Sequence, residues 1–353
     1  MKIGVIHPSF EVVGGAEQTT YSILRALKNT HHNVTLYTTT KNPEIPPEIK
    51  ICHIQRNSFP IGWSLQRILD TKKLFSKAKN EDILFISSGN LILTDTKKNV
   101  IIYCHSTFES ELKKLEKIKS GFTKLYYKYI QKQIKFQLEL LKKSSVKLIA
   151  NSNYTKEKIK EIFGKDSTVI YPPVKINKKN NQKNGIITIA RYSKEKKLEF
   201  NLHVIKNFKI QYKVFGNARF PSQLNYYNSL KKIILNHEHI ELYLNSERDE
   251  IEKNLNSSKV YFQSSEETFG ISVVEGILAG CIPIVPDNSA NKETVPFDEL
   301  RYVENDENDA GGKIELAING DFDKFLIKLQ DHAKRFSEEN FQKNVINYLS
   351  KFE

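Results

Sequence analysis

Two glutamates, Glu267 and Glu275, are separated by seven residues in the run Glu-Thr-Phe-Gly-Ile-Ser-Val-Val-Glu. Apolar runs on either side predict one buried strand at 259–262 and the next at 282–285. The glutamates therefore fall on a strand-to-helix loop and the first turns of a helix, where open α/β sheets bind ligands. Backbone N–H groups of Phe269, Gly270 and Ile271 would suit a phosphate there, with one carboxylate on each side.

Glycines and a histidine follow two strands expected earlier in the chain. Gly14 and Gly15 come shortly after the first strand, where they would let backbone N–H groups approach a phosphate or sugar. The plain alternative for them is a tight turn, and their pattern is not the Gly-x-Gly-x-x-Gly dinucleotide fingerprint, which argues against an oxidoreductase. His105 ends another expected strand, with a structural histidine as its alternative interpretation.

A basic pair follows the first strand of the second half of the chain. Arg191 and Lys196 could converge on one anionic group, because arginine offers a bidentate fork and lysine a point charge. Solvated surface charge is the alternative in a chain this rich in lysine. With the glutamates, the glycines and His105, the pair provides what a cleft needs to hold a nucleotide diphosphate sugar.

Alternating strands and helices must position these groups. In the first half we expect strands at 2–7, 33–38, 51–54, 82–87, 100–103 and 146–151, with helices at 16–27, 65–77, about 109–143 and 155–163. The polar run 176–185 predicts an interdomain linker, after which the alternation restarts. We therefore predict an α/β fold with two Rossmann-like, doubly wound domains, at 1–176 and 177–335, facing a central cleft, and a last helix at 336–353.

Composition narrows the class of protein. The 353 residues allow two full cores, and 39% hydrophobic with 27% charged residues is ordinary for a soluble globular protein. Apolar runs are too short for a membrane span, and three scattered cysteines (Cys52, Cys104 and Cys281) suit a reducing cytoplasm. The net charge of +13 favours polyanions as partners, although part of it reflects a general richness in lysine.

Taken together, these motifs resemble those of the retaining GT-B glycosyltransferases of family 4, which carry an E-x7-E motif. Further matches are His7-Pro8 with Gly14-Gly15-Ala16-Glu17, Ala150–Thr155, Tyr171-Pro172-Pro173 and Arg191 with Lys196. The resemblance covers nearly the whole chain. It is closest to the lipid-linked-oligosaccharide mannosyltransferases of the Alg2 and Alg11 type.

The resemblance implies a role for each residue. Arg191 and Lys196 would bind the donor diphosphate, assisted by the backbone of Phe269, Gly270 and Ile271. Glu267 would contact the transferred sugar, Glu275 the ribose, and His105 the sugar from the other domain. Gly14 and Gly15 would line the diphosphate and acceptor side. Retaining members use the leaving phosphate to help deprotonate the acceptor, so we nominate no protein base.

Three loops depart from the family pattern. Gly216 is the one glycine kept of a usual Gly-x-Gly, Asn245 stands where glycine is common, and Asn288-Ser289-Ala290 replaces a typical Gly-Gly. These loops contact the base and the sugar of the donor. A lone Asp321-x-Asp323 stands at an expected helix start, where aspartate is favoured by the helix dipole, so we expect neither a metal nor another cofactor.

Residues 112–147 combine many lysines with aromatic and aliphatic residues at helical spacing. A basic amphipathic helix of this kind suits an anionic bilayer surface, and a surface helix packed on the sheet is the alternative. No nucleic-acid-binding motif accompanies the charge, so we expect no nucleic acid partner. The expected location is the cytoplasm, peripheral on the membrane face.

The sequence therefore predicts a glycosyltransferase that moves a hexose, mannose from GDP-mannose, onto a lipid-linked or other membrane-associated glycan. Three alternatives stay open: a UDP-sugar donor, a sugar-nucleotide epimerase of the same fold, and a non-catalytic nucleotide-sugar-binding protein.

Overall fold

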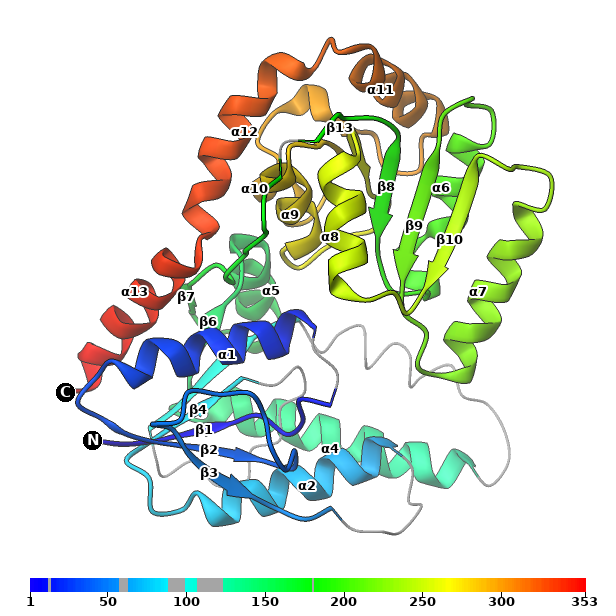
Figure 1. Cartoon of the computed structure of the whole chain (residues 1–353). Coiled ribbons are helices and arrows are strands. Elements are labelled where there is room, and N and C mark those ends of the chain that lie inside the picture. The colour runs from blue at the N-terminus through cyan, green and yellow to red at the C-terminus, as the bar shows by residue number, and fades with distance from the viewer. Residues whose placement is uncertain (12–13, 57–62, 88–98, 107–122, 180) are drawn as a thin grey trace. The chain divides into compact units, whose positions relative to one another are not determined.

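A computed structural model describes residues 1–11, 14–56, 63–87, 99–106, 123–179 and 181–353, which form two compact units. The first unit comprises residues 1–173 and 338–353, and the second comprises residues 174–337. Each unit contains a parallel sheet with helices on both faces (Figure 1). The expected α/β class with two doubly wound domains is confirmed.

The first unit is built on a seven-stranded parallel sheet in the order β3-β2-β1-β4-β5-β6-β7. The strands are β1 (Lys2–Ile6), β2 (Asn33–Thr38), β3 (Lys50–His53), β4 (Ile83–Ile86), β5 (Asn99–Cys104), β6 (Lys147–Ala150) and β7 (Thr168–Val169). Every pairing is parallel, and the central strands are almost wholly apolar because helices cover both of their faces. The strand order reverses between β1 and β4, which makes this the switch point of the sheet.

Helices cover the two faces of this sheet in two separate cores. One core contains α1 (Gly15–Lys28) and the returning helix α13 (Glu338–Leu349), which is followed by η5 (Ser350–Phe352). The other contains α2 (Trp63–Lys77), α4 (Thr123–Lys143) and α5 (Asn153–Phe163). Of the helical region expected at about 109–143, the part before residue 123 lies outside the described residues.

Local signals explain where these helices begin and end. In α5 the Ser152 hydroxyl accepts the Thr155 N–H at 2.9 Å, and Gly164 ends the helix at a left-handed φ of 66°. In α13 the side chains of Phe341, Val345 and Leu349 are buried in the core of the first unit. That spacing of four residues is the amphipathic pattern visible in the sequence.

The second unit is built on a six-stranded parallel sheet in the order β10-β9-β8-β11-β12-β13. The strands are β8 (Ile186–Ile189), β9 (Tyr212–Gly216), β10 (Ile240–Leu244), β11 (Val260–Phe262), β12 (Ile282–Pro286) and β13 (Arg301–Tyr302). Here the order reverses between β8 and β11. The loops that follow these two strands therefore meet at the carboxyl edge of the sheet.

Seven α-helices and four short 3₁₀ helices described in the second unit connect its strands or follow them. Those before residue 280 are η1 (Lys194–Lys196), α6 (Leu198–Ile205), α7 (Pro221–Ile233), α8 (Arg248–Ser257) and α9 (Ile271–Ala279). Those after it are α10 (Asn291–Thr294), η2 (Asp298–Leu300), α11 (Glu307–Asn319), η3 (Asp323–Phe325), α12 (Leu326–Ala333) and η4 (Lys334–Phe336). Helix α9 packs against α8 and α12, and α6 packs against α7 and α11.

The polar run 176–185 belongs to the second unit rather than standing apart as a linker. The side chain of Asn256 makes two hydrogen bonds to the backbone of this run. Its Oδ1 accepts the Lys179 N–H at 2.8 Å, and its Nδ2 donates to the Asn177 carbonyl at 3.0 Å. Lys183 Nζ donates to the Ala279 carbonyl at 2.6 Å. The boundary between the units therefore falls at residues 173 and 174, and the second unit ends at residue 337 rather than 335.

Candidate functional site

An ion pair joins the loops after β8 and β11 at the switch point of the second sheet. Lys196, in η1, donates from Nζ to Oε1 of Glu267 at 2.5 Å, and the two side chains are 15% and 17% exposed. The Ser264 hydroxyl adds a second connection, since it lies 3.0 Å from the carbonyls of both Lys196 and Lys197. The sequence-predicted Lys196 and Glu267 thus form one group at the position where α/β sheets bind ligands.

Two further donors converge on the same oxygen of Glu267. Gln263 Nε2 lies 2.6 Å from Oε1, and the Ser265 hydroxyl lies 3.1 Å from it. With Lys196 they fix the carboxylate by charge-assisted hydrogen bonds. A carboxylate held this way keeps acceptor capacity for a hydroxyl group of a ligand.

Arg191 lies apart from this pair. Its side chain is 59% exposed, and its guanidinium Nη2 is 3.8 Å from Glu195 Oε1. The structure therefore brings Lys196 to Glu267 and leaves Arg191 on the surface of the same loop. An exposed arginine at this edge is placed to meet an anion that enters from solvent.

Glu275 is paired with an arginine that the sequence did not nominate. Arg248, the first residue of α8, donates from Nη2 to Glu275 Oε1 at 2.7 Å and from Nε to Glu252 Oε1 at 2.8 Å. Glu275 is 8% exposed, and its burial raises the pKa of its carboxyl group although Arg248 acts to lower it. The only sequence signal for Arg248 is its place in the loop after β10, at the same sheet edge.

The loop between the two glutamates ends at the N-terminus of α9. Gly270 caps that helix at φ 90°, and Phe269 is buried with its ring centroid 5.0 Å from that of Phe336. The glycine is required because a left-handed φ disfavours other residues. The first N–H groups of a helix have no partner within it and carry partial positive charge, so this turn suits an anionic group.

Two residues in the loops that depart from the family's glycine pattern have left-handed backbone angles. Asn245 has φ 57° and Ser289 has φ 51°, left-handed values that glycine adopts most easily. Gly216 retains its glycine for a different reason, because a Cβ atom there would lie 2.3 Å from the Ala190 carbonyl oxygen. Asn245 and Ser289 therefore adopt left-handed backbone angles without being glycines.

Ser289 also holds Glu267. Its hydroxyl accepts the Glu267 N–H at 3.0 Å, and the Ala290 N–H donates to the Glu267 carbonyl at 3.2 Å. We expect Ser289→Gly, which tolerates the left-handed φ but lacks the hydroxyl, to lower the rate of sugar transfer about fivefold, as for one lost hydrogen bond of about 1 kcal/mol. Steady-state kinetics with a thermal unfolding scan check this result. Unchanged kinetics in Ser289→Gly would remove Ser289 from the support of Glu267.

In the first unit, polar side chains gather at the switch point between β1 and β4. His7 is 2% exposed, and its Nδ1 contacts the Ser87 carbonyl and lies 2.9 Å from the Thr20 hydroxyl. The Ser87 hydroxyl lies 2.9 Å from the same Thr20 hydroxyl and 3.2 Å from Nε2 of His105. The sequence-predicted His105 thus belongs to a hydrogen-bonded group that sequence reasoning did not otherwise find.

Glu17 links this group to the glycine loop. Its Oε2 accepts the Gly14 N–H at 2.9 Å, and its Oε1 lies 3.4 Å from His7 Nε2. Burial alone would raise the pKa of Glu17, but the hydrogen bond and charge of His7 and the backbone N–H groups lower it overall. Gly14 is therefore the N-cap of α1, and the Glu17 carboxylate accepts the hydrogen bond of its N–H group. Gly15 is the first residue of the helix.

Burial lowers the pKa of His105 to about 3, so its imidazole is neutral at physiological pH. We expect His105→Asn to reduce the transfer rate without changing the shape of the pH profile between about pH 5 and 9, because His105 does not titrate there. The measurement is kcat/KM against pH for both proteins. A rise or fall near pH 6.5 that the variant lacks would contradict a neutral His105.

The exposed face of α4 carries apolar side chains among lysines. Leu125 is 79% exposed, Tyr129 43% and Phe136 55%, and their spacing of four and seven residues places them on one side of the helix. Six lysines lie in this helix against one glutamate: Lys124, Lys128, Lys132, Lys135, Lys142 and Lys143 against Glu139. In the described part of the chain, no helix combines the length and apolar character needed to cross a membrane.

Comparisons with known proteins identify the family and the fold of this chain. The family model of Glycosyltransferase Family 4 matches residues 13–178, and that of Glycosyl transferases group 1 matches residues 174–342. The chain is 24% identical over 234 residues to a GDP-Man:Man(3)GlcNAc(2)-PP-Dol alpha-1,2-mannosyltransferase of Dictyostelium discoideum. That match covers 57% of this chain and 46% of the relative, so the chain spans about half the length of this curated protein.

Solved structures share the fold over the whole chain. A glycosyltransferase from Rickettsia africae is 18% identical with a TM-score of 0.71, covering 100% of this chain and 98% of its own. Anabaena HepE in complex with UDP and glucose is 15% identical with a TM-score of 0.73, covering 99% of each chain. The two family models together extend from residue 13 to residue 342, and the chain belongs to the family 4 glycosyltransferases with the GT-B fold.

Proposed function

We propose that this glycosyltransferase moves a mannosyl group from GDP-mannose onto a lipid-linked or other membrane-associated glycan, with retention of configuration. The observation that carries the proposal is the Lys196–Glu267 pair at the switch point of the second sheet, which combines a cation with an oriented carboxylate. The choice of mannose and of GDP is supported by the printed activity of the Dictyostelium relative.

In this proposal the cations of the second unit stabilise the departing diphosphate. Arg191 reaches the diphosphate from the exposed side. Lys196, which pairs with Glu267, also interacts with the phosphate oxygens. The N-terminal turn of α9 at Gly270 and Ile271 adds backbone N–H donors. These cations and N–H groups are already in place when negative charge develops on the leaving diphosphate. Their stabilisation of that charge is the largest electrostatic contribution to such a reaction.

The carboxylates bind hydroxyl groups rather than transferring protons. Glu267, held through Oε1 by three donors, accepts hydrogen bonds from the transferred sugar. Glu275 accepts from the ribose, which places two hydroxyl donors beside a buried carboxylate whose pKa is already raised by burial. No protein base is assigned, because the leaving phosphate can take the proton of the acceptor hydroxyl, and no metal or other cofactor is assigned.

In the first unit, His105 approaches the transferred sugar as a neutral hydrogen-bonding group, and Gly14 and Gly15 line the diphosphate and acceptor side. The hydrogen bond of Ser87 holds the side chain of His105 in place, and that of Glu17 holds the backbone of Gly14. A neutral imidazole can donate from one nitrogen and accept at the other, which suits a sugar hydroxyl.

Calorimetric titration with GDP and with UDP tests the choice of donor. We expect GDP to bind at least tenfold more tightly than UDP, and Arg191→Ala to weaken GDP binding. Tighter binding of UDP would reject the mannose assignment. The UDP-sugar donor is the second candidate, because Anabaena HepE shares the fold and its structures contain UDP and UDP-glucose.

Product analysis without an acceptor distinguishes the remaining alternatives. An epimerase of the same fold would convert the sugar of the donor in the absence of any acceptor, whereas a transferase releases the nucleotide. A non-catalytic nucleotide-sugar-binding protein would bind the donor and turn over none of it.

The exposed face of α4 suits the cytoplasmic surface of an anionic membrane that carries the acceptor. Its lysines each contribute about 1 kcal/mol near such a surface, and Leu125 and Phe136 would enter the headgroup region. We expect vesicles with phosphatidylglycerol to bind the protein and neutral vesicles not to, and Leu125→Ser with Phe136→Ser to weaken the binding. Cosedimentation measures this, with Leu224→Ser on α7, where Leu224 is 44% exposed, as the control. Equal binding by both variants would contradict the assignment to α4.

A further inference from the structure

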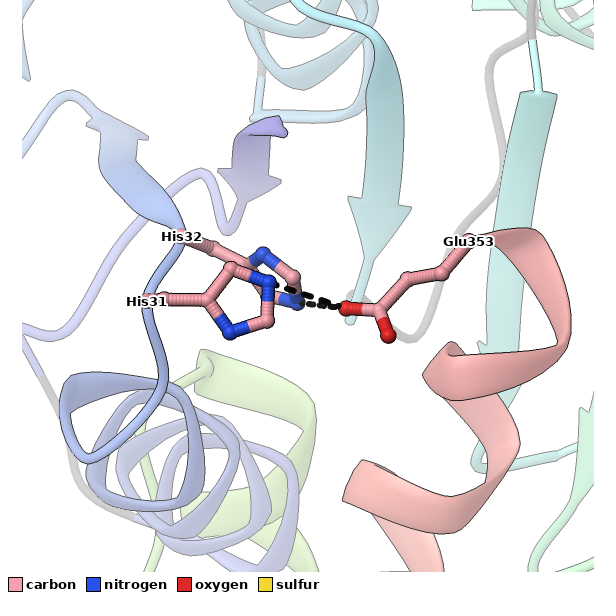
Figure 2. Close-up of side chains that lie close together, drawn as sticks. All are labelled: His31, His32 and Glu353. Atoms are coloured by element: carbon pink, nitrogen blue, oxygen red, sulfur yellow. Dashed lines mark ion pairs between the residues drawn. The ribbon is translucent and has the colours of Figure 1, made fainter.

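Two histidines and a glutamate meet in the first unit, away from the residues discussed so far (Figure 2). His31 and His32 lie on the turn between α1 and β2, and Glu353 follows η5 at the other end of the chain. Oε1 of Glu353 is 3.2 Å from Nε2 of His31 and 3.1 Å from Nε2 of His32. Because His32 precedes β2 whereas His7 follows β1, the cluster lies at the opposite edge of the sheet from His7.

The donor atoms match a transition-metal site. Two imidazole nitrogens and one carboxylate oxygen are ligands that Zn²⁺, Ni²⁺ and Cu²⁺ accept, and the three atoms all lie within 4.8 Å of one another. Ligand atoms about 2.1 Å from a tetrahedral zinc ion are about 3.4 Å apart, close to the two nitrogen–oxygen distances found here. We propose that His31, His32 and Glu353 bind a divalent transition-metal ion of the zinc type.

The exposed side chains of two of the three proposed ligands leave room for the ion and for a water ligand. The side chain of His31 is 77% exposed and that of Glu353 is 40% exposed, whereas that of His32 is only 4% exposed. His32 therefore supplies a fixed nitrogen, and the other two ligands can adjust by small rotations. A fourth position remains open to solvent, as three protein ligands require.

His32 lacks the outer hydrogen bond that metal-binding histidines usually make. Nδ1 of His32 is buried without a hydrogen-bond partner among the described residues, and the missing outer contact weakens affinity by about 10–100-fold.

Such an ion would fasten η5 to the turn between α1 and β2. The residues that precede Glu353 form α13 and η5, and α13 is packed in the core through Phe341, Val345 and Leu349. A metal that joins Glu353 to the turn before β2 would oppose separation of α13 and η5 from that core. Its role is structural, because it lies at the edge of the sheet opposite the glycine loop.

The tag-free 353-residue protein, stripped of metal with a chelator and dialysed, provides the test. Calorimetry with Zn²⁺ should give one equivalent bound, and a hundredfold excess of Zn²⁺ over its dissociation constant should raise the Tm by about 5 °C. His31→Ala and Glu353→Gln, both at exposed positions, should each remove the binding and the Tm shift. His237→Ala is the matched control, because His237 and His239 form a second histidine pair, with ring centroids 5.8 Å apart, in the other unit.

Three results would overturn the proposal. The first is the absence of saturable Zn²⁺ binding by the wild-type chain. The second is binding that survives in His31→Ala and Glu353→Gln, which would place the ion elsewhere. The third is a Tm of the wild-type chain that exceeds that of Glu353→Gln by the same amount with and without Zn²⁺, which would show that the cluster is only a set of hydrogen bonds.

Discussion

Replacement of Glu267 by alanine is expected to lower sugar transfer by about 10²–10³-fold while the protein stays folded. The carboxylate has three donors on one oxygen, and its proposed contact with the transferred sugar strengthens as charge develops at the reacting carbon. The loss should appear in kcat more than in KM, because a group that acts in the transition state changes the chemical step. Initial rates with the donor at saturation measure it.

Glu266 provides the control for this prediction. It is the neighbouring residue, its side chain is exposed, and the same change in charge there should leave the rate within about twofold because it removes no buried contact. Glu267→Gln separates shape from charge, since it keeps the size of the side chain and can still accept a hydrogen bond. Full transfer by Glu267→Ala would remove Glu267 from the site.

Lys196→Met is expected to lower kcat by about 10²–10³-fold and to weaken binding of the nucleotide diphosphate. The methionine keeps most of the apolar stem of the lysine and removes the charge that faces both Glu267 and the proposed diphosphate. Lys194→Met is the matched control, because Lys194 lies in the same 3₁₀ turn with an exposed side chain. Measurement of kcat and of GDP binding in both variants tests the prediction.

A double variant separates catalysis from stability. Lys196→Met leaves the partly buried Glu267 without its cation, which destabilises the protein, whereas Lys196→Met with Glu267→Gln removes both charges. We expect the double variant to recover thermal stability but not activity. Recovery of activity along with stability would show that the pair is structural and that the diphosphate is bound elsewhere.

The sequence predicted the elements of the fold wherever strands were long and apolar. β1, β2 and β12 were expected from such runs, and each lies where parallel strands buried on both faces must lie. β7 and β13 were missed because each has only two residues, too few for any periodicity. The segment 176–185 looked like a linker because it is polar, but the side chain of Asn256 satisfies its backbone groups.

The site was predictable where one motif contained its residues and not where contacts join distant loops. Glu267 and Glu275 share one loop and helix, so their spacing alone indicated a ligand site. Arg248 lies 27 residues from Glu275 in the sequence and is brought to it by the packing of α8 against α9. The contacts of Ser87 with Thr20 and His105 likewise depend on the adjacency of β1, β4 and β5.

Turnover of GDP-mannose by the purified protein tests the central claim most directly. Proton NMR of the reaction, with or without a glycan acceptor, should show GDP release, with mannose freed or transferred in the anomeric configuration that it had in the donor. Glu267→Ala should lower the rates of GDP release and of mannose transfer by about 10²–10³-fold. Turnover of a UDP-sugar with no release of GDP from GDP-mannose, or a product of inverted configuration, would contradict the account.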